Sequence, residues 1–423
     1  METRSRYLSK GADSTVIIIY ILLMIFGWIN IFATEYNGSW DIFNLSKNYG
    51  KQLLWISVSS LLFLTVMGFK KGLIRYMSFP IYIVITLLLA SVLVIGSATK
   101  GDKAWIDLGF FKLQPSEFSK FATAMALAAY LDMPGIKFSN PSQRLKAFAI
   151  VGIPLLLVLA QGDAGTCLVF LGFVFVYNKE GLPDGLLYLG FFFIIISVLS
   201  LAISPIYIII GLLLLALLLI YMYYVSPRDR GLIRLLWLII FLSMGYSLAV
   251  NTVFNKVLEP HQKDRINVIL GKVTDPAGVA YNLNQSKIAI GSGGFFGKGF
   301  LQGTQTRYNY VPEMSTDFIF SAVGEEWGFI GSVGVILLFT ILIAKLIQMA
   351  DRQRSTYSRV YIMSIASIFF MHFMINIGMT IGLLPVIGIP LPFMSYGGSS
   401  LMSFSFMLAT AIKLDSERMM SLN

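Results

Sequence analysis

Long runs without charge follow one another along the chain and indicate its architecture. A helix needs about 20 apolar residues to cross the roughly 30 Å apolar core of a bilayer. Residues other than Asp, Glu, Lys and Arg fill the stretches 14–34, 52–69, 76–99, 121–131, 147–162, 164–178, 185–227, 235–255, 327–344 and 360–412. The two longest stretches can each hold two helices, turned at Ser204-Pro205 and between Pro385 and Pro392. The pattern predicts an all-α, polytopic membrane protein with about twelve transmembrane helices.

The composition agrees with this pattern. Of the 423 residues 56% are apolar and only 13% are charged, whereas a soluble domain carries roughly 25% charged residues. Lys and Arg outnumber Asp and Glu by 32 to 22. In a membrane protein such an excess is typical of cytoplasmic loops and of contact with anionic headgroups, so we expect no nucleic-acid partner. The single cysteine, Cys167, excludes an internal disulfide and a site with several cysteine ligands.

The cations also predict which side each loop occupies, because cytoplasmic loops of membrane proteins are enriched in Lys and Arg. With an inside N-terminus and twelve crossings, most cations fall on the cytoplasmic side, among them Arg4, Lys70, Arg144, Arg228 and Arg352. We therefore expect residues 1–423 to form one membrane domain with both termini in the cytoplasm. Within it, residues 185–225 form a transmembrane hairpin and residues 256–316 an outer loop.

The outer loop is too long to be a simple connection. Loops beyond roughly 15 residues are usually either functional or disordered. This one carries apolar and aromatic residues throughout and a glycine-rich run from Gly291 to Gly299, which favours an ordered cap on the membrane surface. The run lacks the Gly-Lys-Ser/Thr ending of a phosphate-binding loop, so it does not predict a nucleotide site.

Asp317, just after this loop, is the first candidate for chemistry. Ser315 or Thr316 can cap a helix whose first turn holds Asp317, and complementing the helix dipole there is the simpler explanation of the carboxylate. Lys345 lies 28 residues further on, or about 42 Å of unbroken helix. A lysine at the inner headgroups would therefore place Asp317 at the outer headgroups. Glu325, about 12 Å deeper, then needs protein, a cation or water as a partner.

His372 lies in the middle of a charge-free run, with no Cys, Asp or Glu within helical reach. This position favours a packed or hydrogen-bonded core residue over a metal ligand or a proton relay.

Several long motifs occur together in an order that resembles one family. They are residues 105–109 with 114–117, 285–294, 299–305, 316–320 and 384–400. Over nearly its whole length the chain is similar to the SEDS family (shape, elongation, division, sporulation). The wording of residues 285–294 resembles the elongation branch of that family more than its division branch.

The resemblance implies a peptidoglycan glycosyltransferase that polymerises lipid II into glycan strands outside the bacterial cytoplasmic membrane, for cell elongation and shape. The implied partners are lipid II, the growing undecaprenyl-linked strand, a class B penicillin-binding protein as the transpeptidase, and other membrane proteins of the elongation complex. The family's proposed catalytic aspartate falls on Asp317. As a general base it would take the proton of the acceptor sugar's 4-hydroxyl.

Further residues of these motifs and of the outer face are expected to serve the substrate. We expect substrate binding from Glu117, Lys120, Lys287, Lys298, Arg307 and Ser395. We expect supporting roles from Trp105, Asp163, Gln285 and Glu325. For each cation a solvated or headgroup-facing position is an equally good explanation, and Glu117 and Lys120, three residues apart on a helix, can pair with each other. A divalent cation, Mg or Mn, could help at the diphosphate, although no ligand set is predicted.

The chain departs from the family pattern in three places. Ala104 stands where the family usually has Arg, and Gly162 replaces a proline beside Asp163. The family usually has ten crossings, so the 185–225 hairpin would be an insertion.

Two other functions stay open. The first is a lipid II flippase, which needs a polar route on both sides of the membrane. The side chains that would line this route are Glu117, Lys120, Asp163, Glu325 and Glu326. A scaffold without chemistry would tolerate the loss of Asp317.

Overall fold

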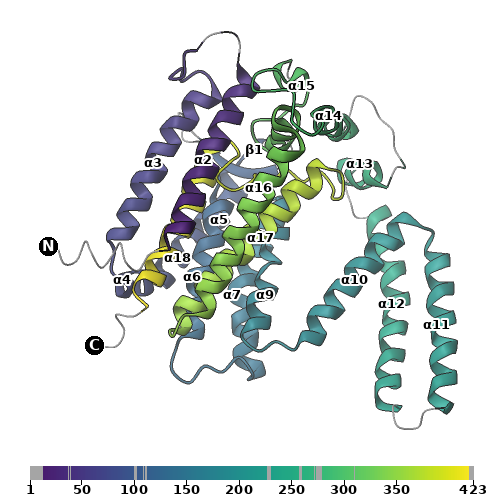
Figure 1. Cartoon of the computed structure of the whole chain (residues 1–423). Helices are drawn as coiled ribbons and strands as arrows, with labels where there is room; N and C mark the ends of the chain where they lie inside the picture. Colours follow the sequence, from purple (N-terminus) through teal and green to yellow (C-terminus); the bar gives the residue numbers. More distant parts are fainter. Residues whose placement is uncertain are drawn as a thin grey trace. The chain divides into compact units, whose positions relative to one another are not determined.

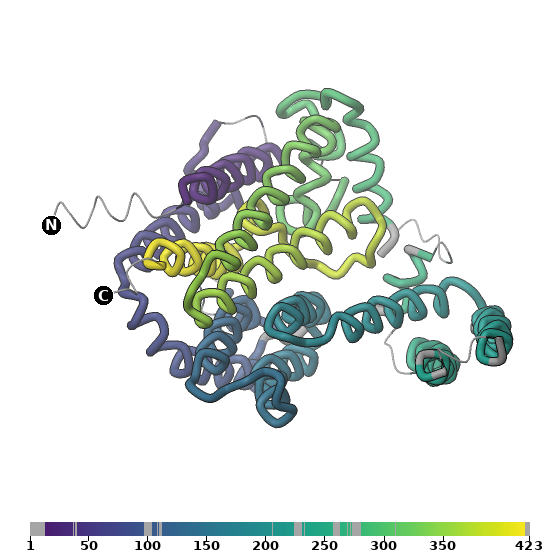
Figure 2. Tube along the Cα trace, turned by 60° about the horizontal axis from the view of Figure 1, so that its bottom comes forward, coloured from purple at the N-terminus to yellow at the C-terminus, as the bar shows by residue number. Residues whose placement is uncertain are grey.

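The computed structural model describes residues 13–36, 38, 40–99, 102–107, 109, 112–225, 230–256, 260–270, 272, 279–308 and 310–418 (Figures 1 and 2). Nine helices within these residues are long and apolar enough to cross a membrane. The predicted all-α polytopic membrane fold is therefore confirmed, while the number of twelve crossings stays a prediction. The predicted cytoplasmic residues Arg4 and Arg228 lie outside the described residues.

The chain divides into two compact units, residues 1–182 with 282–423, and residues 183–281. The first part of the larger unit contains α2 (Ser14–Glu35), α3 (Asn48–Gly68), α4 (Lys71–Tyr76), α5 (Ser78–Ile95), β1 (Ser97–Thr99), β2 (Asp102–Asp107), β3 (Lys112–Leu113), α6 (Pro115–Leu131), α7 (Pro141–Ala160), α8 (Ala164–Phe170) and α9 (Phe173–Lys179). Its second part contains most of α14 (Val279–Ser292), then α15 (Thr304–Arg307), α16 (Ile319–Asp351), α17 (Thr356–Thr380) and α18 (Gly398–Ser416).

Local sequence signals explain where several of these helices begin. Asp13 caps α2 by accepting a hydrogen bond from the Thr15 amide at 3.2 Å, and Asn140 caps α7 in the same way. Pro115 and Pro141 occupy the first turns of α6 and α7, where a missing amide proton costs nothing.

The centre of the larger unit is α6, which packs against α5, α17 and α18. Nearly every residue of α6 is buried, and alanines at 122, 124, 126, 128 and 129 let the neighbouring helices approach closely. In Figure 1 the helices α16 and α17 run side by side, and they pack against each other along their length. The core that positions the polar residues discussed below is thus built from α6, α16, α17 and α18.

Ion pairs join the two ends of the described chain at one end of this bundle. The Arg352 guanidinium lies 3.8 Å from the Asp13 carboxylate, and its Nε donates to Asp415 at 2.7 Å. Because Asp13 precedes the first described helix and Asp415 lies in the last turns of α18, both ends lie on the same side of the bundle.

A three-stranded antiparallel sheet precedes α6. Ser97 is paired with Trp105, and Ile106 with Leu113. This short sheet interrupts the all-helical pattern in the region 97–117.

The smaller unit contains α10 (Asp184–Ala202), α11 (Pro205–Val225), α12 (Arg230–Lys256) and α13 (Pro260–Ile269). The predicted turn at Ser204-Pro205 falls between α10 and α11. Figures 1 and 2 show α11 and α12 as antiparallel neighbours, seen from the side and almost end-on. Ser200 and Ser247 share a buried hydrogen bond of 2.8 Å between α10 and α12. Whether α10 and α11 form a complete membrane hairpin stays a prediction.

Candidate active site

The region around Asp317 differs from the sequence prediction in two ways. Helix α16 begins at Ile319, so Asp317 lies in a turn before the helix and not in its first turn. The turn exists because the amides of Thr316 and Phe318 both donate to the carbonyl of Glu313, at 3.1 and 3.2 Å. In addition, Gly328 has a φ of 64° and interrupts α16, so the predicted unbroken helix from Asp317 to Lys345 is wrong.

The break at Gly328 is filled by the glycine-rich segment 294–299. In an unbroken helix the carbonyls of Glu325 and Glu326 would accept from the amides of Phe329 and Ile330. Here the segment supplies the replacement bonds: Lys298 N to Glu325 O at 3.0 Å, Gly299 N to Glu326 O at 3.0 Å, Phe329 N to Gly294 O at 2.9 Å and Ile330 N to Phe295 O at 3.2 Å. All four opened backbone groups are therefore satisfied, as an apolar surrounding requires.

Glu325 also fixes the neighbouring segment, residues 298–306, through its side chain. Its carboxylate is buried and accepts hydrogen bonds from five donors. They are Lys298 Nζ (2.7 Å), Thr304 Oγ1 (3.2 Å), Gln305 N (2.9 Å), Thr306 N (2.8 Å) and Thr306 Oγ1 (2.7 Å). Lys298, expected to bind substrate, is thus held by a carboxylate of its own chain.

The backbone of Asp317 is bound by α17. Asn376 Nδ2 on α17 donates to the Asp317 carbonyl at 2.8 Å and to the Ile389 carbonyl at 2.7 Å. The Asp317 side chain is partly exposed, and a Cβ on Gly388 would lie 3.3 Å from its Oδ2. The carboxylate therefore lies beside the turn that connects α17 and α18, at a fixed backbone position.

Ser395 belongs to the same turn and fixes its neighbours. Its hydroxyl donates to the carbonyl of Thr316 at 2.6 Å and accepts from the amide of Leu391 at 2.8 Å. The Tyr396 amide donates to the carbonyl of Ser315 at 2.8 Å. Ser395 is buried, so its hydroxyl orders the backbone next to Asp317.

Glu117 and Lys120 form the pair that their spacing on α6 permits. Lys120 Nζ donates to Glu117 Oε2 at 2.8 Å and lies 2.8 Å from His372 Nε2, and all three side chains are buried. The prediction that His372 is a hydrogen-bonded core residue is confirmed.

Asp163 caps α8 and also ties it to α6. It accepts from the amide and hydroxyl of Thr166 at 2.9 and 2.8 Å, from Ser116 Oγ at 3.0 Å and from Gln114 Nε2 at 3.3 Å. Trp105 on β2 is half-buried. These residues lie around the start of α6, and the contacts of Asp163 are those of a structural anchor.

Gln285 and Lys287 lie on α14, which is tied to α17 by a 2.9 Å hydrogen bond from Ser286 Oγ to the Thr380 carbonyl. Gln285 is half-buried and Lys287 is exposed. The Lys287 ammonium lies against Gly382, where a Cβ would come within 2.5 Å of Nζ.

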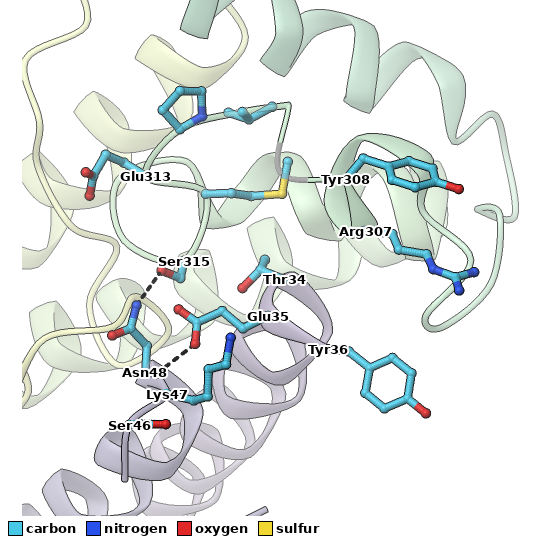
Figure 3. A pocket seen from close by; sticks show the side chains of 13 residues that line it. Thr34, Glu35, Tyr36, Ser46, Lys47, Asn48, Arg307, Tyr308, Glu313 and Ser315 are labelled. Atoms are coloured by element: carbon cyan, nitrogen blue, oxygen red, sulfur yellow. Dashed lines mark hydrogen bonds between the residues drawn. The ribbon is translucent and has the colours of Figure 1, made fainter. Parts of the chain in front are cut away.

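A cavity of about 680 Å³ lies at the ends of α2 and α3, next to the segment that leads to Asp317. It is lined by Thr34, Glu35, Tyr36, Ser46, Lys47, Asn48, Arg307, Tyr308, Val311, Pro312, Glu313, Met314 and Ser315. Figure 3 shows Asn48 at its wall, where the backbone amide donates to Glu35 at 2.7 Å and the side chain reaches Ser315 Oγ at 3.4 Å. Among the predicted substrate cations, Arg307 lines this cavity.

Among the described residues no three His, Cys, Asp or Glu side chains converge as a metal site would require.

Comparisons with known proteins identify the family. A family model described as "Cell cycle protein", covering FtsW, RodA and SpoVE, matches residues 13–419. The peptidoglycan glycosyltransferase RodA of Treponema pallidum is 30% identical over 95% of this chain and 96% of its own length. The peptidoglycan glycosyltransferase MrdB of Escherichia coli K12 is 30% identical over 92% of this chain and 89% of its own length. This chain belongs to the SEDS family.

Solved structures share the fold. A chain of a peptidoglycan synthase complex that coordinates polymerization and crosslinking matches 96% of this chain and 98% of its own length, with a TM-score of 0.68 and 24% identity. Thermus thermophilus RodA matches 96% of this chain and 97% of its own length, with a TM-score of 0.61 and 22% identity. This shared fold and the names of the relatives confirm the predicted class of the protein, a multi-pass membrane glycosyltransferase.

Some residues at the site of this SEDS protein were not predicted from its sequence. Asn376, which holds Asp317, lies four residues after His372 on the same face of α17, and two polar side chains at this spacing inside a charge-free run are a usable signal. Lys47 precedes α3 and Asn48 begins it, in a polar stretch that also contains Lys51, where polar residues are too common to single out.

Proposed function

We propose that this SEDS protein polymerises lipid II into glycan strands outside the cytoplasmic membrane, with Asp317 as the general base. The observation that carries the proposal is the contrast within one residue: the Asp317 backbone is bonded to Asn376 at 2.8 Å, whereas its side chain is partly exposed. A carboxylate with a fixed origin and access to substrate is what proton transfer in a transition state requires.

The reaction balances with this one base. The acceptor sugar's 4-hydroxyl oxygen attacks the donor's anomeric carbon and forms the new glycosidic C–O bond, while the bond to the lipid diphosphate breaks and the diphosphate leaves with the electron pair. Asp317 takes the hydroxyl proton. Such a transfer typically contributes 10²–10⁴-fold, and the orientation of two lipid-anchored substrates supplies much of the remainder.

Arg307 and Lys287 are the cations that we assign to the diphosphate. Both side chains are exposed, and neither forms an ion pair with a described acidic residue. Arg307 lines the cavity beside the catalytic segment, and its planar fork can hold phosphate oxygens from two sides, whereas Lys287 acts as a point charge. Lys298 has a smaller role in this scheme because Glu325 already binds it.

The proposed orientation has both termini in the cytoplasm and the segment 291–317 outside. It is supported by the meeting of Asp13 and Asp415 at Arg352, which needs an even number of crossings between them, and by the distribution of cations. A membrane-impermeant thiol reagent should label a cysteine placed at Ser204 from outside and leave one placed at Arg230 unlabelled. Equal labelling of both from the cytoplasm would contradict the twelve-crossing topology.

The proposed partner is a class B penicillin-binding protein that crosslinks the new strands, together with other membrane proteins of the elongation complex. The match to a chain of a synthase complex that combines polymerization and crosslinking supports this pairing.

The flippase alternative has one supporting feature, the buried Glu117–Lys120 pair inside the bundle. That pair is closed by its own hydrogen bonds and by His372, which suits a structural role better than a path for a sugar headgroup.

The test uses the purified full-length protein and fluorescent lipid II, with and without the penicillin-binding protein. We expect a ladder of glycan chains on a gel, and the Asp317→Asn variant serves as the negative control. Movement of labelled lipid II across vesicles without any ladder would favour the flippase, and neither activity would favour the scaffold.

A further inference from the structure

We infer that His372 is a positioning residue: together with Lys120 it braces the turn 388–390, and through this turn it fixes the carboxylate of Asp317. The inference rests on the proposed role of Asp317 as the base. It gives a role to a buried histidine that takes no part in the proposed proton transfer.

The hydrogen bonds around His372 determine which ring nitrogen carries the proton. Nδ1 lies 3.1 Å from the carbonyl oxygen of Pro390, and since a carbonyl can only accept, Nδ1 must carry the hydrogen. A neutral imidazole has one N–H, so Nε2 presents a lone pair. That lone pair faces Lys120 Nζ at 2.8 Å, and an ammonium can only donate. The bonds therefore run in one direction, from Lys120 to His372 and from His372 to Pro390.

Lys120 is itself held in place, so the hydrogen bonds that run through His372 to Pro390 start from a fixed atom. Its side chain is 0% exposed and donates to Glu117 Oε2 at 2.8 Å. Nζ lies 5.1 Å from the centre of the Phe404 ring, which also packs edge-on against His372 at 4.8 Å. In such a site a donor that loses its acceptor has no water to replace it, so the ammonium strongly favours the observed histidine position.

One helical turn further along α17, Asn376 completes the brace. His372 and Asn376 are four residues apart and share a face, and they bind the consecutive carbonyls of Pro390 and Ile389. Asn376 also holds the carbonyl of Asp317 at 2.8 Å. The preceding residue, Gly388, has a φ of 79° and lies so close to Asp317 that a Cβ there would be 3.3 Å from Oδ2. A shift of this turn therefore changes the surroundings of the proposed base.

Two conservative variants separate the two bonds of His372. His372→Asn places an amide N–H where Nδ1 was and keeps the bond to Pro390, while it removes the acceptor for Lys120. His372→Gln places an amide oxygen where Nε2 was and keeps the bond from Lys120, while it loses Pro390. His372→Leu removes both bonds. Each variant is purified at full length and assayed with fluorescent lipid II over a concentration series.

We expect His372→Gln to lower the maximal rate by about tenfold or more, because a misplacement of 1 Å can cost 10²-fold, while the lipid II concentration for half-maximal rate stays unchanged. His372→Asn should keep most of the maximal rate although it is less stable to heat. The matched control is Ser78→Ala, which removes another buried hydrogen bond, the one of 2.9 Å to Tyr357 in the first turn of α17. This change should lower stability and leave the rate unchanged, because the lost bond lies at the start of α17.

Equal maximal rates for the Asn and Gln variants, measured per folded molecule, would overturn the inference and return His372 to a packing role. Asp317→Asn is measured alongside. If that variant is inactive while the two His372 variants are equal, only the positioning role fails. If Asp317→Asn retains normal activity, the proposed base fails first, and the positioning role falls with it.

Discussion

Two carboxylates eight residues apart, Asp317 and Glu325, have opposite surroundings. Glu325 is buried, and both of its oxygens accept hydrogen bonds, from Lys298, Thr304, Gln305 and Thr306. Asp317 has its backbone carbonyl bound by Asn376 and a partly exposed side chain. The carboxylate of Glu325 is therefore enclosed by its own chain, whereas the side chain of Asp317 is partly exposed to solvent.

This difference separates a structural carboxylate from a chemical one. Glu325 can take up a substrate proton only if it gives up hydrogen bonds that hold the cap, each of which is costly to lose in a buried site. Asp317 can change its side-chain bonding without disturbing the backbone that positions it. The following substitutions test this contrast, in order of decreasing expected effect.

Asp317→Asn should nearly abolish polymerisation, with a loss of about 10²–10⁴-fold, because the amide keeps the shape of the carboxylate but cannot accept the proton. Gel analysis of labelled glycan products measures the loss. Asp41→Asn, an exposed carboxylate in the connection between α2 and α3, is the control and should stay active. Near-normal chain formation by the Asp317 variant would break the contrast and leave Asp317 a structural residue.

Glu325→Gln should act on stability first. Its NH2 group would face either Lys298, Thr304 and Gln305, or the two donors of Thr306, and so leave donors without an acceptor. The loss of one partner of a buried ion pair costs about 3–5 kcal/mol. Lys298 is 26% exposed, which places the expected cost at the lower end. Thermal unfolding in detergent measures it. A Glu325→Gln protein that is as stable as the parent but inactive would make Glu325 the better candidate for the base.

Gly328→Ala should weaken the inserted segment. A residue with a side chain at φ 64° costs of order 1–3 kcal/mol, and the new Cβ would lie 2.2 Å from the amide nitrogen of Gly297. Gly334→Ala on the same helix is the matched control, because a Cβ there meets nothing within 4 Å and alanine favours a helix. The midpoint of thermal unfolding should fall for the first variant only, and equal midpoints would contradict the role given to the break.

The smallest effects should come from the cations. Arg307→Gln and Lys287→Gln should raise the lipid II concentration for half-maximal rate by about three- to tenfold, as expected for the loss of an exposed charged hydrogen bond, with the larger effect at Arg307. Lys298→Gln should instead lower stability, in line with its bond to Glu325. Lys51→Gln, at an exposed position of α3, is the control. Unchanged concentration dependence in both of the first two variants would mean that these side chains are surface cations that do not bind the substrate.

The sequence alone predicted the nine apolar helices found among the described residues, and it contains local signals for several of their ends. Crossing a bilayer depends on the length and apolarity of a contiguous run, and caps such as Asp13 and Asn140 act within two or three residues. Both are local properties, so the chain displays them without its fold. The family motifs added Asp317 as a candidate, because they too are contiguous in sequence.

The tertiary structure decided how the polar residues are used. Lys120 and His372 are 252 positions apart. Glu325 binds its donors Gln305 and Thr306 only once the segment that holds them has packed against α16. The break at Gly328 is stable because a distant segment supplies the four missing backbone bonds, and nothing in the residues around Gly328 encodes that supply. A buried polar group takes its role from its partners, and these partners come together only when the helices pack.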